Sequence, residues 1–270
     1  MINKTLKIFN WICVTVIFWQ FLNCTFIGRD RSVLAIDNNS RIAPFNNPQM
    51  DEEPADRGSP DSNRSGAGRG DSCVTDPPLT ALVPPLDTND YVWGLTTQAY
   101  PKFWLYVPYS SNPSMNIEFQ LRDESGKSVL NNKQAIAIAL PETSGIINFR
   151  LPETQQSLVI DKWYQWSFVI NCDSEEFWVR GWIKQVVFDG DLLSASPVVR
   201  LDNFVESGIW FDAITEVAEQ LKSNPNDSIF FNAWSQLLAD VKLEDISIQP
   251  FVSCCTINHS QLPNNTNAPQ

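Results

Sequence analysis

A period of two residues runs through the middle of the sequence, and this feature constrains the fold more than any other. Between residues 79 and 187, apolar side chains alternate with polar ones in short runs bounded by turn residues, as in half-buried strands. We expect strands over residues 103–107, 117–121, 136–140, 146–151, 166–170 and 177–187. Such strands, with prolines at their ends, predict an antiparallel β-sandwich of immunoglobulin-like or fibronectin-like layout over residues 79–200, in an undetermined strand order.

After residue 201 the period changes to that of a helix. Two apolar faces at helical spacing are formed by Trp210, Ile214, Val217 and Leu221, and by Phe230, Phe231, Trp234, Leu237, Leu238 and Val241. Ser207 and Asp227 are the expected N-caps, and Asn224-Pro225 ends the first helix. The sequence therefore predicts a mainly β protein with a C-terminal helical hairpin over residues 205–243. We expect Ile246 and Ile248 to add a last strand.

The N-terminal residues 1–27 have the pattern of an export signal. Two lysines precede an apolar run over residues 8–22. The alternative is an uncleaved membrane anchor over residues 8–27, because the apolar run alone spans about 22 Å as a helix whereas a bilayer core is about 30 Å thick. Lipidation of Cys24 fits less well, since Asn23 stands where such signals carry a small residue. We therefore expect an extracytoplasmic protein, periplasmic or secreted, which contacts a membrane only through this segment.

A polar segment over residues 28–72 separates this leader from the strands. Prolines and a cluster of glycine, serine and arginine interrupt any period, and Phe45 is its only aromatic residue. We expect a disordered linker here, followed by a single globular domain over residues 73–250 and a polar tail over residues 251–270.

Four cysteines follow the leader, and export would allow them to oxidise. Cys73 opens the folded region and Cys172 ends a strand, so the preferred disulfide joins these two; two free buried thiols are the alternative. Cys254 and Cys255 lie in the tail, where a vicinal bond, a bond to another chain and no bond all stay open. We expect no metal site and no other cofactor, because there is no Cys-x-x-Cys spacing and no histidine near any of the four.

Charge and histidine content argue against several classes of function. The formal net charge of −12 repels nucleic acid. His259 in the tail is the only histidine, so the folded region lacks the usual general base. The remaining catalytic candidates are paired carboxylates, Glu175 with Glu176 or Asp189 with Asp191. We interpret both pairs as solvated turns, and we expect a protein that is not an enzyme.

Tryptophans on neighbouring strands form the clearest binding pattern. Trp178 and Trp182 flank Arg180 on one strand face, and Trp166 lies on the preceding strand. Aromatic platforms of this kind can stack on sugar rings. The alternative, which we prefer, is structural: a cation–π ladder on the outer sheet face, and a tryptophan in the core.

Ordered blocks along the chain resemble a known family. The blocks are residues 69–70 (RG), 79–84 (LTALVP), 94–96 (GLT), 103–109 (FWLYVPY), 118–124 (EFQLRDE), 163–172 (WYQWSFVINC), 181–183 (GWI), 210–213 (WFDA) and 234–238 (WSQLL). Over about residues 69–250 they resemble a cyanobacterial exported family known as domain of unknown function 928. The resemblance implies an exported protein with no assigned activity, and it supplies no catalytic residues.

These observations favour a non-enzymatic module that binds a protein, or acts as a scaffold, in the cell envelope. Phe211 and Asp212 lie off the apolar stripe of their helix, so we expect this block to dock on the sheet or to face a partner. Two other hypotheses are binding of an envelope polysaccharide through Trp166, Trp178 and Trp182, and a carboxylate-dependent hydrolase.

Overall fold

The computed structural model describes residues 42–45, 63–65, 73–85, 92–112, 115–131, 135–172, 175–190 and 194–253. They all belong to one compact unit, Arg41–Gln270. The expected leader or anchor, most of the expected linker, and Cys254, Cys255 and His259 of the tail lie outside the described residues. Within the ranges described, no helix is long and apolar enough to cross a bilayer.

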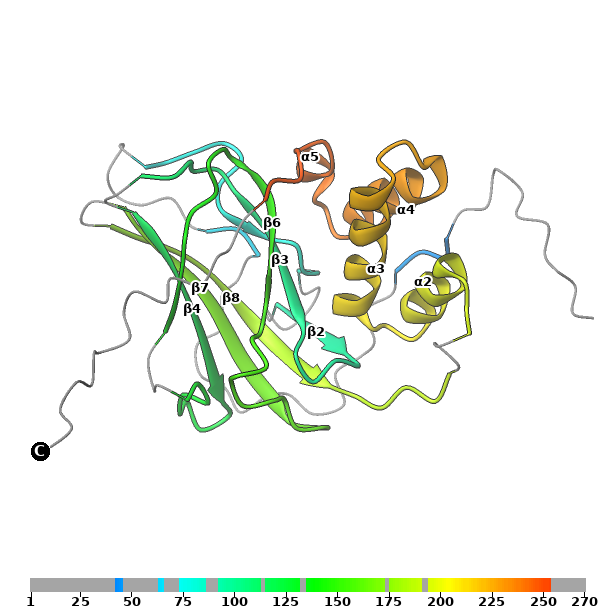
Figure 1. Cartoon of the computed structure of the whole chain (residues 1–270), viewed down its shortest axis with the longest axis horizontal. Coiled ribbons are helices and arrows are strands. Elements are labelled where there is room, and N and C mark those ends of the chain that lie inside the picture. Colours follow the sequence, from blue (N-terminus) through cyan, green and yellow to red (C-terminus); the bar gives the residue numbers. More distant parts are fainter. Residues whose placement is uncertain are drawn as a thin grey trace, which may run out of the picture. The chain divides into compact units, whose positions relative to one another are not determined.

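Eight strands of the described chain form two sheets (Figure 1). The strands are β1 (Thr80–Ala81), β2 (Trp93–Thr96), β3 (Lys102–Val107), β4 (Asn116–Asp123), β5 (Ile136–Ile138), β6 (Gly145–Arg150), β7 (Trp163–Cys172) and β8 (Glu175–Gln185). One sheet has the order β1-β3-β6 and the other β2-β8-β7-β4-β5. Immunoglobulin-like sandwiches place strands A, B and E in one sheet and C, F and G in the other. Here β1, β3 and β6 lie in one sheet and β4, β7 and β8 in the other, which is the same division of strands between the sheets.

The strand pairing differs from the expectation at one edge. β2 pairs with β8 in parallel, with Trp93 opposite Trp182, so the expectation of purely antiparallel pairing is wrong here. A short hairpin connection, such as that between β7 and β8, joins only antiparallel strands. β2 and β8 are instead far apart in the sequence, and the chain enters β2 from β1 of the other sheet.

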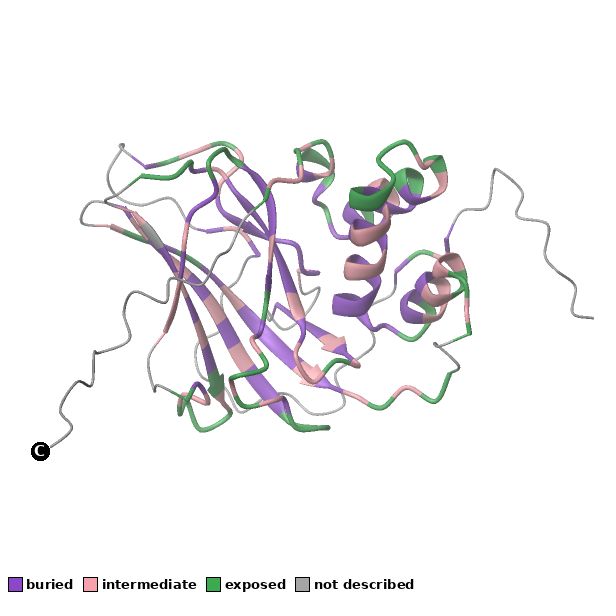
Figure 2. Cartoon of the chain, in the orientation of Figure 1, coloured by how far each residue is buried: buried purple, intermediate pink, exposed green. Residues whose placement is uncertain are grey.

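Aromatic side chains fill the space between the sheets. Every second residue of β7 from Trp166 to Cys172 is buried, as the predicted alternation requires (Figure 2). At the centre, the ring of Phe119 lies 4.7 Å from that of Phe149 and 5.0 Å from that of Phe168, measured between centroids. Such pairs contribute about 0.5–1.5 kcal/mol each beyond their buried area.

A glycine admits the largest ring of this core. Gly181 on β8 lies opposite Trp166 on β7. A Cβ at position 181 would lie 2.6 Å from Cζ2 of Trp166 and 2.6 Å from the carbonyl oxygen of Val92. Only glycine therefore allows the indole and the chain before β2 to approach β8 together.

The helices follow the strands. They are α2 (Pro197–Glu206), α3 (Trp210–Ser223), α4 (Ser228–Asp240) and α5 (Glu244–Ser247). The predicted hairpin corresponds to α3 and α4: Asp227 caps α4 by accepting from the amides of Ile229 and Phe230, and Asn224 ends α3. α3 packs on the outer face of the three-stranded sheet, where the Trp104 indole donates to the Thr215 hydroxyl at 3.0 Å.

Two features of the helical region were predicted wrongly. Ser207 does not cap α3: it ends α2, which begins at the N-cap Ser196 with proline in its first turn. Ile246 and Ile248 do not form a strand, because Ile246 lies in α5 and Ile248 ends that helix. Spacing by two also suits a single helical turn that buries one of the two residues, and here Ile246 is buried whereas Ile248 is 81% exposed.

The segment expected to be a disordered linker packs against the domain at two places. Ile42 and Phe45 are buried, with 7% and 8% of their surface exposed. Further on, Ser65 donates its amide to the Leu79 carbonyl at 2.8 Å, and Arg64 pairs with Thr80, which adds residues 63–65 to the edge of β1. The expectation of a wholly solvated linker is wrong at these residues, because their apolar side chains and backbone groups find partners on the domain.

Candidate functional site

The three tryptophans proposed as a platform do not share one surface. Trp166 faces the core, is 1% exposed and contacts the ring of Phe211. Trp182 is on the outer face but is also buried, in a separate cluster with Trp93 and Trp163. A platform that includes Trp166 is therefore excluded by its position inside the sandwich.

Trp178 remains exposed on the outer face, at 40%. The guanidinium carbon of Arg180 lies 4.5 Å from the centroid of its ring. On the same face, the Lys184 ammonium lies 4.8 Å from the ring of Trp163. These stacked pairs have the geometry of the cation–π ladder that we preferred from the sequence.

Of the acidic pairs considered for catalysis, only Glu175 with Glu176 lies wholly within the described residues, and it does not form a site. Glu175 and Glu176 are successive residues at the start of β8, so their side chains point to opposite faces. Asp189 is exposed, and Asp191 lies outside the described residues. In the described part of the chain, no group of three or more histidine, cysteine or acidic residues could hold a metal ion.

Cys73 and Cys172 lie at disulfide distance, with their Cα atoms 6.4 Å apart and a sequence separation of 99. Both are buried. The Tyr109 hydroxyl donates to the carbonyl of Cys73 at 2.8 Å. The pair preferred from the sequence thus ties the start of the domain to the end of β7.

Residues 42–45 bind to α3 and α4 as a short peptide would, in the blue segment beside α3 (Figure 1). The ring of Phe45 meets that of Trp210 nearly edge-on, with centroids 4.7 Å apart. The Phe45 amide donates to the Asp240 carboxylate at 2.9 Å, and the Gln236 side chain donates to the Ile42 carbonyl at 2.9 Å. We call the surface formed by Trp210, Gln236 and Asp240 the docking site.

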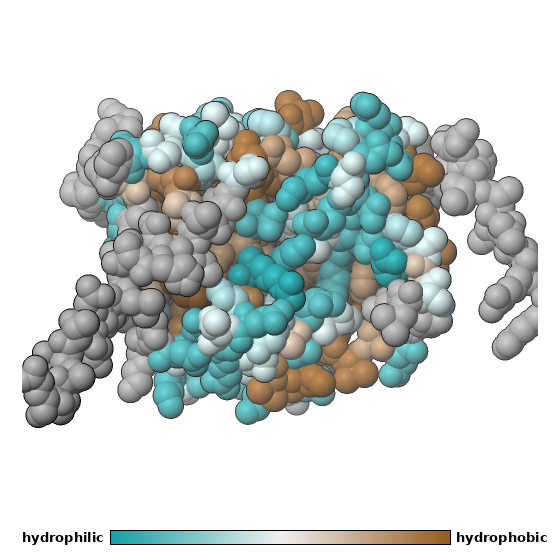
Figure 3. All heavy atoms as spheres, in the orientation of Figure 1, coloured by the Kyte–Doolittle hydropathy of each residue, from teal (hydrophilic) through white to brown (hydrophobic). Residues whose placement is uncertain are grey.

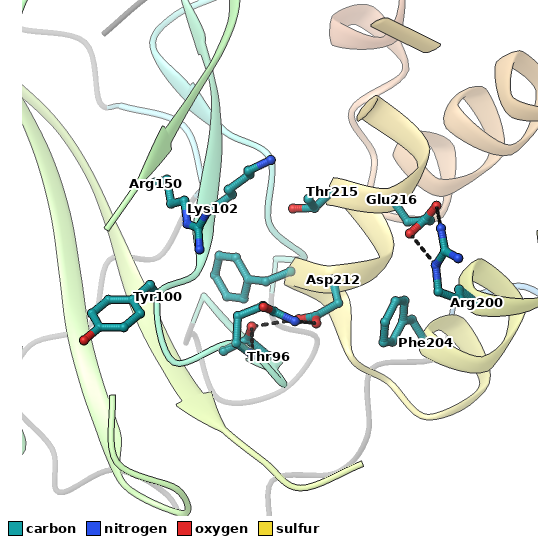
Figure 4. A pocket seen from close by; sticks show the side chains of 11 residues that line it. Thr96, Tyr100, Lys102, Arg150, Arg200, Phe204, Asp212, Thr215 and Glu216 are labelled. Atoms are coloured by element: carbon teal, nitrogen blue, oxygen red, sulfur yellow. Dashed lines mark hydrogen bonds and ion pairs between the residues drawn. The ribbon is translucent and has the colours of Figure 1, made fainter. Parts of the chain in front are cut away.

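A pocket of about 310 Å³ opens between the end of the sandwich and helices α2 and α3 (Figure 4). It is lined by Thr96, Gln98, Tyr100, Lys102, Arg150, Arg200, Phe204, Phe211, Asp212, Thr215 and Glu216. Hydrophilic side chains cover much of the surface in front of β3 and α3 (Figure 3). Because these residues come from five elements and one connection, the pocket exists only in the folded domain.

Asp212 forms the base of this pocket and is 6% exposed. Its carboxylate accepts from the Thr96 hydroxyl at 2.7 Å, from the amide and hydroxyl of Thr97, and from the Gln98 side chain at 3.3 Å. Burial raises the pKa of Asp212, although the hydrogen bonds from Thr97, Thr96 and Gln98 act in the opposite direction. A carboxylate has about four acceptor positions, so these four donors saturate it. Asp212 therefore docks α3 on the end of β2.

Glu216, one turn further along α3, is also engaged within the chain. Its two oxygens accept from Nε and Nη2 of Arg200 at 3.0 and 2.8 Å, and Gln220 donates to one of them at 3.0 Å. The bond to Glu216 raises the pKa of Arg200, which keeps the guanidinium charged. Asp212 is thus saturated, whereas Glu216 accepts three hydrogen bonds and keeps about one of its four acceptor positions open.

Lys102 and Arg150 complete the pocket from the sheet. They lie directly opposite each other on β3 and β6, and Figure 4 shows their side chains leaving the sheet at neighbouring positions, with their charged ends pointing in different directions. Lys102 bonds to Glu219 and Arg150 to Glu153, each at 3.1 Å through one nitrogen. No sequence signal indicated this pair, because its proximity depends on the register of two strands.

Residues 64–251 match the family described as Domain of Unknown Function (DUF928). The chain belongs to the DUF928 family. That family description assigns no activity, and no curated protein matches the chain. The matched region includes the whole pocket and the docking site, whereas residues 42–45 lie outside it.

The DUF928 block over residues 210–213, whose off-stripe residues the sequence left unexplained, docks on the sandwich. The Trp210 indole donates to the carbonyl of Leu82 at 2.8 Å. The ring of Phe211 enters the core beside Phe103 and lies against Gly94. Together with the bonds of Asp212, these contacts account for Phe211 and Asp212 by docking on the sheet.

Proposed function

We propose that this DUF928 domain is a non-catalytic module that works outside the cytoplasm and binds an extended polypeptide segment at the docking site. The observation that carries the proposal is the bound state of residues 42–45. Residues 42–45 lie outside the region that matches the family, whereas the docking site that they occupy lies within it. The segment therefore contacts the domain as a ligand contacts its receptor.

The contacts fit recognition of an extended segment. Asp240 and Gln236 bind the backbone of the segment, at the amide of Phe45 and the carbonyl of Ile42, so these bonds do not depend on its side chains. Pro44 lacks an amide hydrogen and favours an extended backbone, so this position has no backbone donor that needs an acceptor. Specificity would come from Phe45 against Trp210 and from the buried Ile42, three residues apart.

A location outside the cytoplasm is supported by two independent features. The leader has the composition of an export signal, and Cys73 and Cys172 lie at disulfide distance. Together with the docking site, these features support a binding role in the cell envelope. The four hydrogen bonds that saturate the Asp212 carboxylate support a structural rather than a catalytic role for this residue.

The test uses the domain with its own segment weakened. In Phe45→Ala the segment loses its aromatic anchor, and a labelled synthetic peptide of residues 41–47 should then bind in trans, measured by fluorescence anisotropy. The parent should bind this peptide at least tenfold more weakly, because its tethered segment competes at an effective concentration in the millimolar range. A peptide with alanine at position 45 is the matched control.

A second arm mixes two variants. Phe45→Ala has an intact docking site, and a Gln236→Ala/Asp240→Ala double variant has an intact segment, so only docking between copies can satisfy both. Sedimentation should show a mixed dimer that neither variant forms alone at the same concentration. If the peptide fails to bind folded Phe45→Ala and the mixture stays monomeric, the docking site serves only to hold its own segment, and the proposal is wrong.

A further inference from the structure

The pocket between β3, β6 and α3 has several unused hydrogen-bond donors and few free acceptors. Asp212 accepts four hydrogen bonds within the chain and Glu216 accepts three, so only about one acceptor position of the two carboxylates stays open. An ammonium carries three N–H donors and a guanidinium five, and Lys102 and Arg150 each use one on an acidic side chain. A ligand that fits this pocket must therefore bring acceptors.

The charges point the same way. Three cations, Lys102, Arg150 and Arg200, line the pocket with two carboxylates. Like charges directly opposite each other on neighbouring strands destabilise a sheet, and Lys102 and Arg150 hold such positions. Their acidic partners, Glu219 and Glu153, are not among the residues that line the pocket. The position between the two cations is thus where a negative group would relieve their repulsion.

We propose that this pocket binds an oxyanion carried on a ring, such as the carboxylate of an acidic sugar, between Lys102 and Arg150. The Thr215 hydroxyl accepts from Trp104, so its own proton is directed elsewhere and can serve the same anion. The rings of Tyr100, Phe204 and Phe211 also line the pocket, and they offer apolar surface to the body of the ligand. The volume of about 310 Å³ is at the lower end for ligand pockets and suits a single ring.

This site is separate from the docking site. Phe45 contacts α3 through Trp210, whereas the ligand would lie against Asp212, Thr215 and Glu216 on other faces of the helix. Binding of the peptide and binding of the oxyanion can therefore be measured independently, and either can fail without the other.

The experiment is isothermal titration of the full domain with sodium galacturonate, at constant ionic strength. Galactose, which has the same ring without the carboxylate, should bind at least tenfold more weakly. Lys102→Met and Arg150→Gln should each weaken galacturonate binding by about tenfold or more, the usual effect of losing a hydrogen bond to a charged group. Arg122→Gln, on the outer face of the other sheet, is the matched control and should bind as the parent does.

Further arms separate the sources of the oxyanion. Tighter binding of a galacturonate tetramer than of the monomer would identify the ligand as an acidic polysaccharide, and equal binding would identify a free acid. Inorganic sulfate should bind more weakly than galacturonate, because it lacks the ring. Three results would each overturn the proposal. They are equal binding of galactose and galacturonate, no binding of galacturonate at about 20 mM at the ionic strength of the assay, and unchanged binding of galacturonate by folded Lys102→Met.

Discussion

Loss of the Cys73–Cys172 bond should lower the free energy of unfolding by about 4–5 kcal/mol. The bond closes a loop with a sequence separation of 99. In the chain-entropy description, a closed loop of about 100 residues removes about 4.7 kcal/mol of conformational freedom from the unfolded chain at 25 °C. For a domain of this size, 1 kcal/mol corresponds to about 2–4 °C, so the expected loss in Tm is about 10–20 °C.

The assay compares Cys73→Ala, Cys172→Ala and the double variant, with the tail cysteines Cys254 and Cys255 replaced by serine throughout. Each single variant already breaks the bond, so the double variant should lose little more than either single one. Urea unfolding followed by tryptophan fluorescence gives the free energies, and the oxidised parent should show a smaller m-value because its unfolded state stays more compact.

The reasoning is refuted if the two single changes are small and additive. Additive effects would mean that the two sites do not share a bond. Alkylation of the unfolded protein before reduction gives the same answer in another way, because both cysteines are buried in the folded domain. Two thiols modified at Cys73 and Cys172 in the unfolded but unreduced chain would mean that they are free.

Two further predictions concern single residues. Gly181→Ala should destabilise the domain by about 3 kcal/mol, because its Cβ would meet Trp166 and a backbone oxygen. A free energy of unfolding in urea within about 0.5 kcal/mol of that of the parent would contradict this. Because burial raises the pKa of Asp212, its contribution to stability is full below about pH 4 and is lost as pH rises through the folded pKa. The stability difference between the parent and Asp212→Asn should therefore shrink from pH 4 to 7. Asp123 should show the opposite slope, since its bond with Ser125 lowers its pKa; matching slopes at the two sites would exclude this account.

The strands could be predicted because each shows its own period. The alternating burial of β7 is visible in the order of its residues, and the same holds for the apolar faces of α3 and α4. β2 escaped prediction because four residues are too few to show a period. α2 escaped because Ser207 was interpreted as the start of the next helix, although Ser196 and Pro197 carry the usual signal for a helix start.

The candidate sites could not be predicted, because they depend on register and on contacts between distant segments. Lys102 and Arg150 are 48 positions apart in the sequence, and only the pairing of β3 with β6 brings them together. Phe45 could be identified as the only aromatic residue of its segment, but no local pattern indicates that it packs on Trp210. Sequence periodicity describes a face of one element, whereas a site needs the faces of several.

The first turn of α3 connects both sites, and this decides which variants can separate them. Trp210 contacts the docked Phe45 and also holds the helix to Leu82, while Phe211 and Asp212 line the pocket and fasten the same turn to the sandwich. A substitution at any of these residues would alter both sites, so a change in binding could not be assigned to one of them. Phe45 and Lys102 each contribute to one site and lie outside α3, so Phe45→Ala and Lys102→Met are the pair that separates them. If galacturonate binding changes in Phe45→Ala, the two sites are coupled through this turn, and linkage requires that galacturonate then change the affinity for the peptide by the same factor.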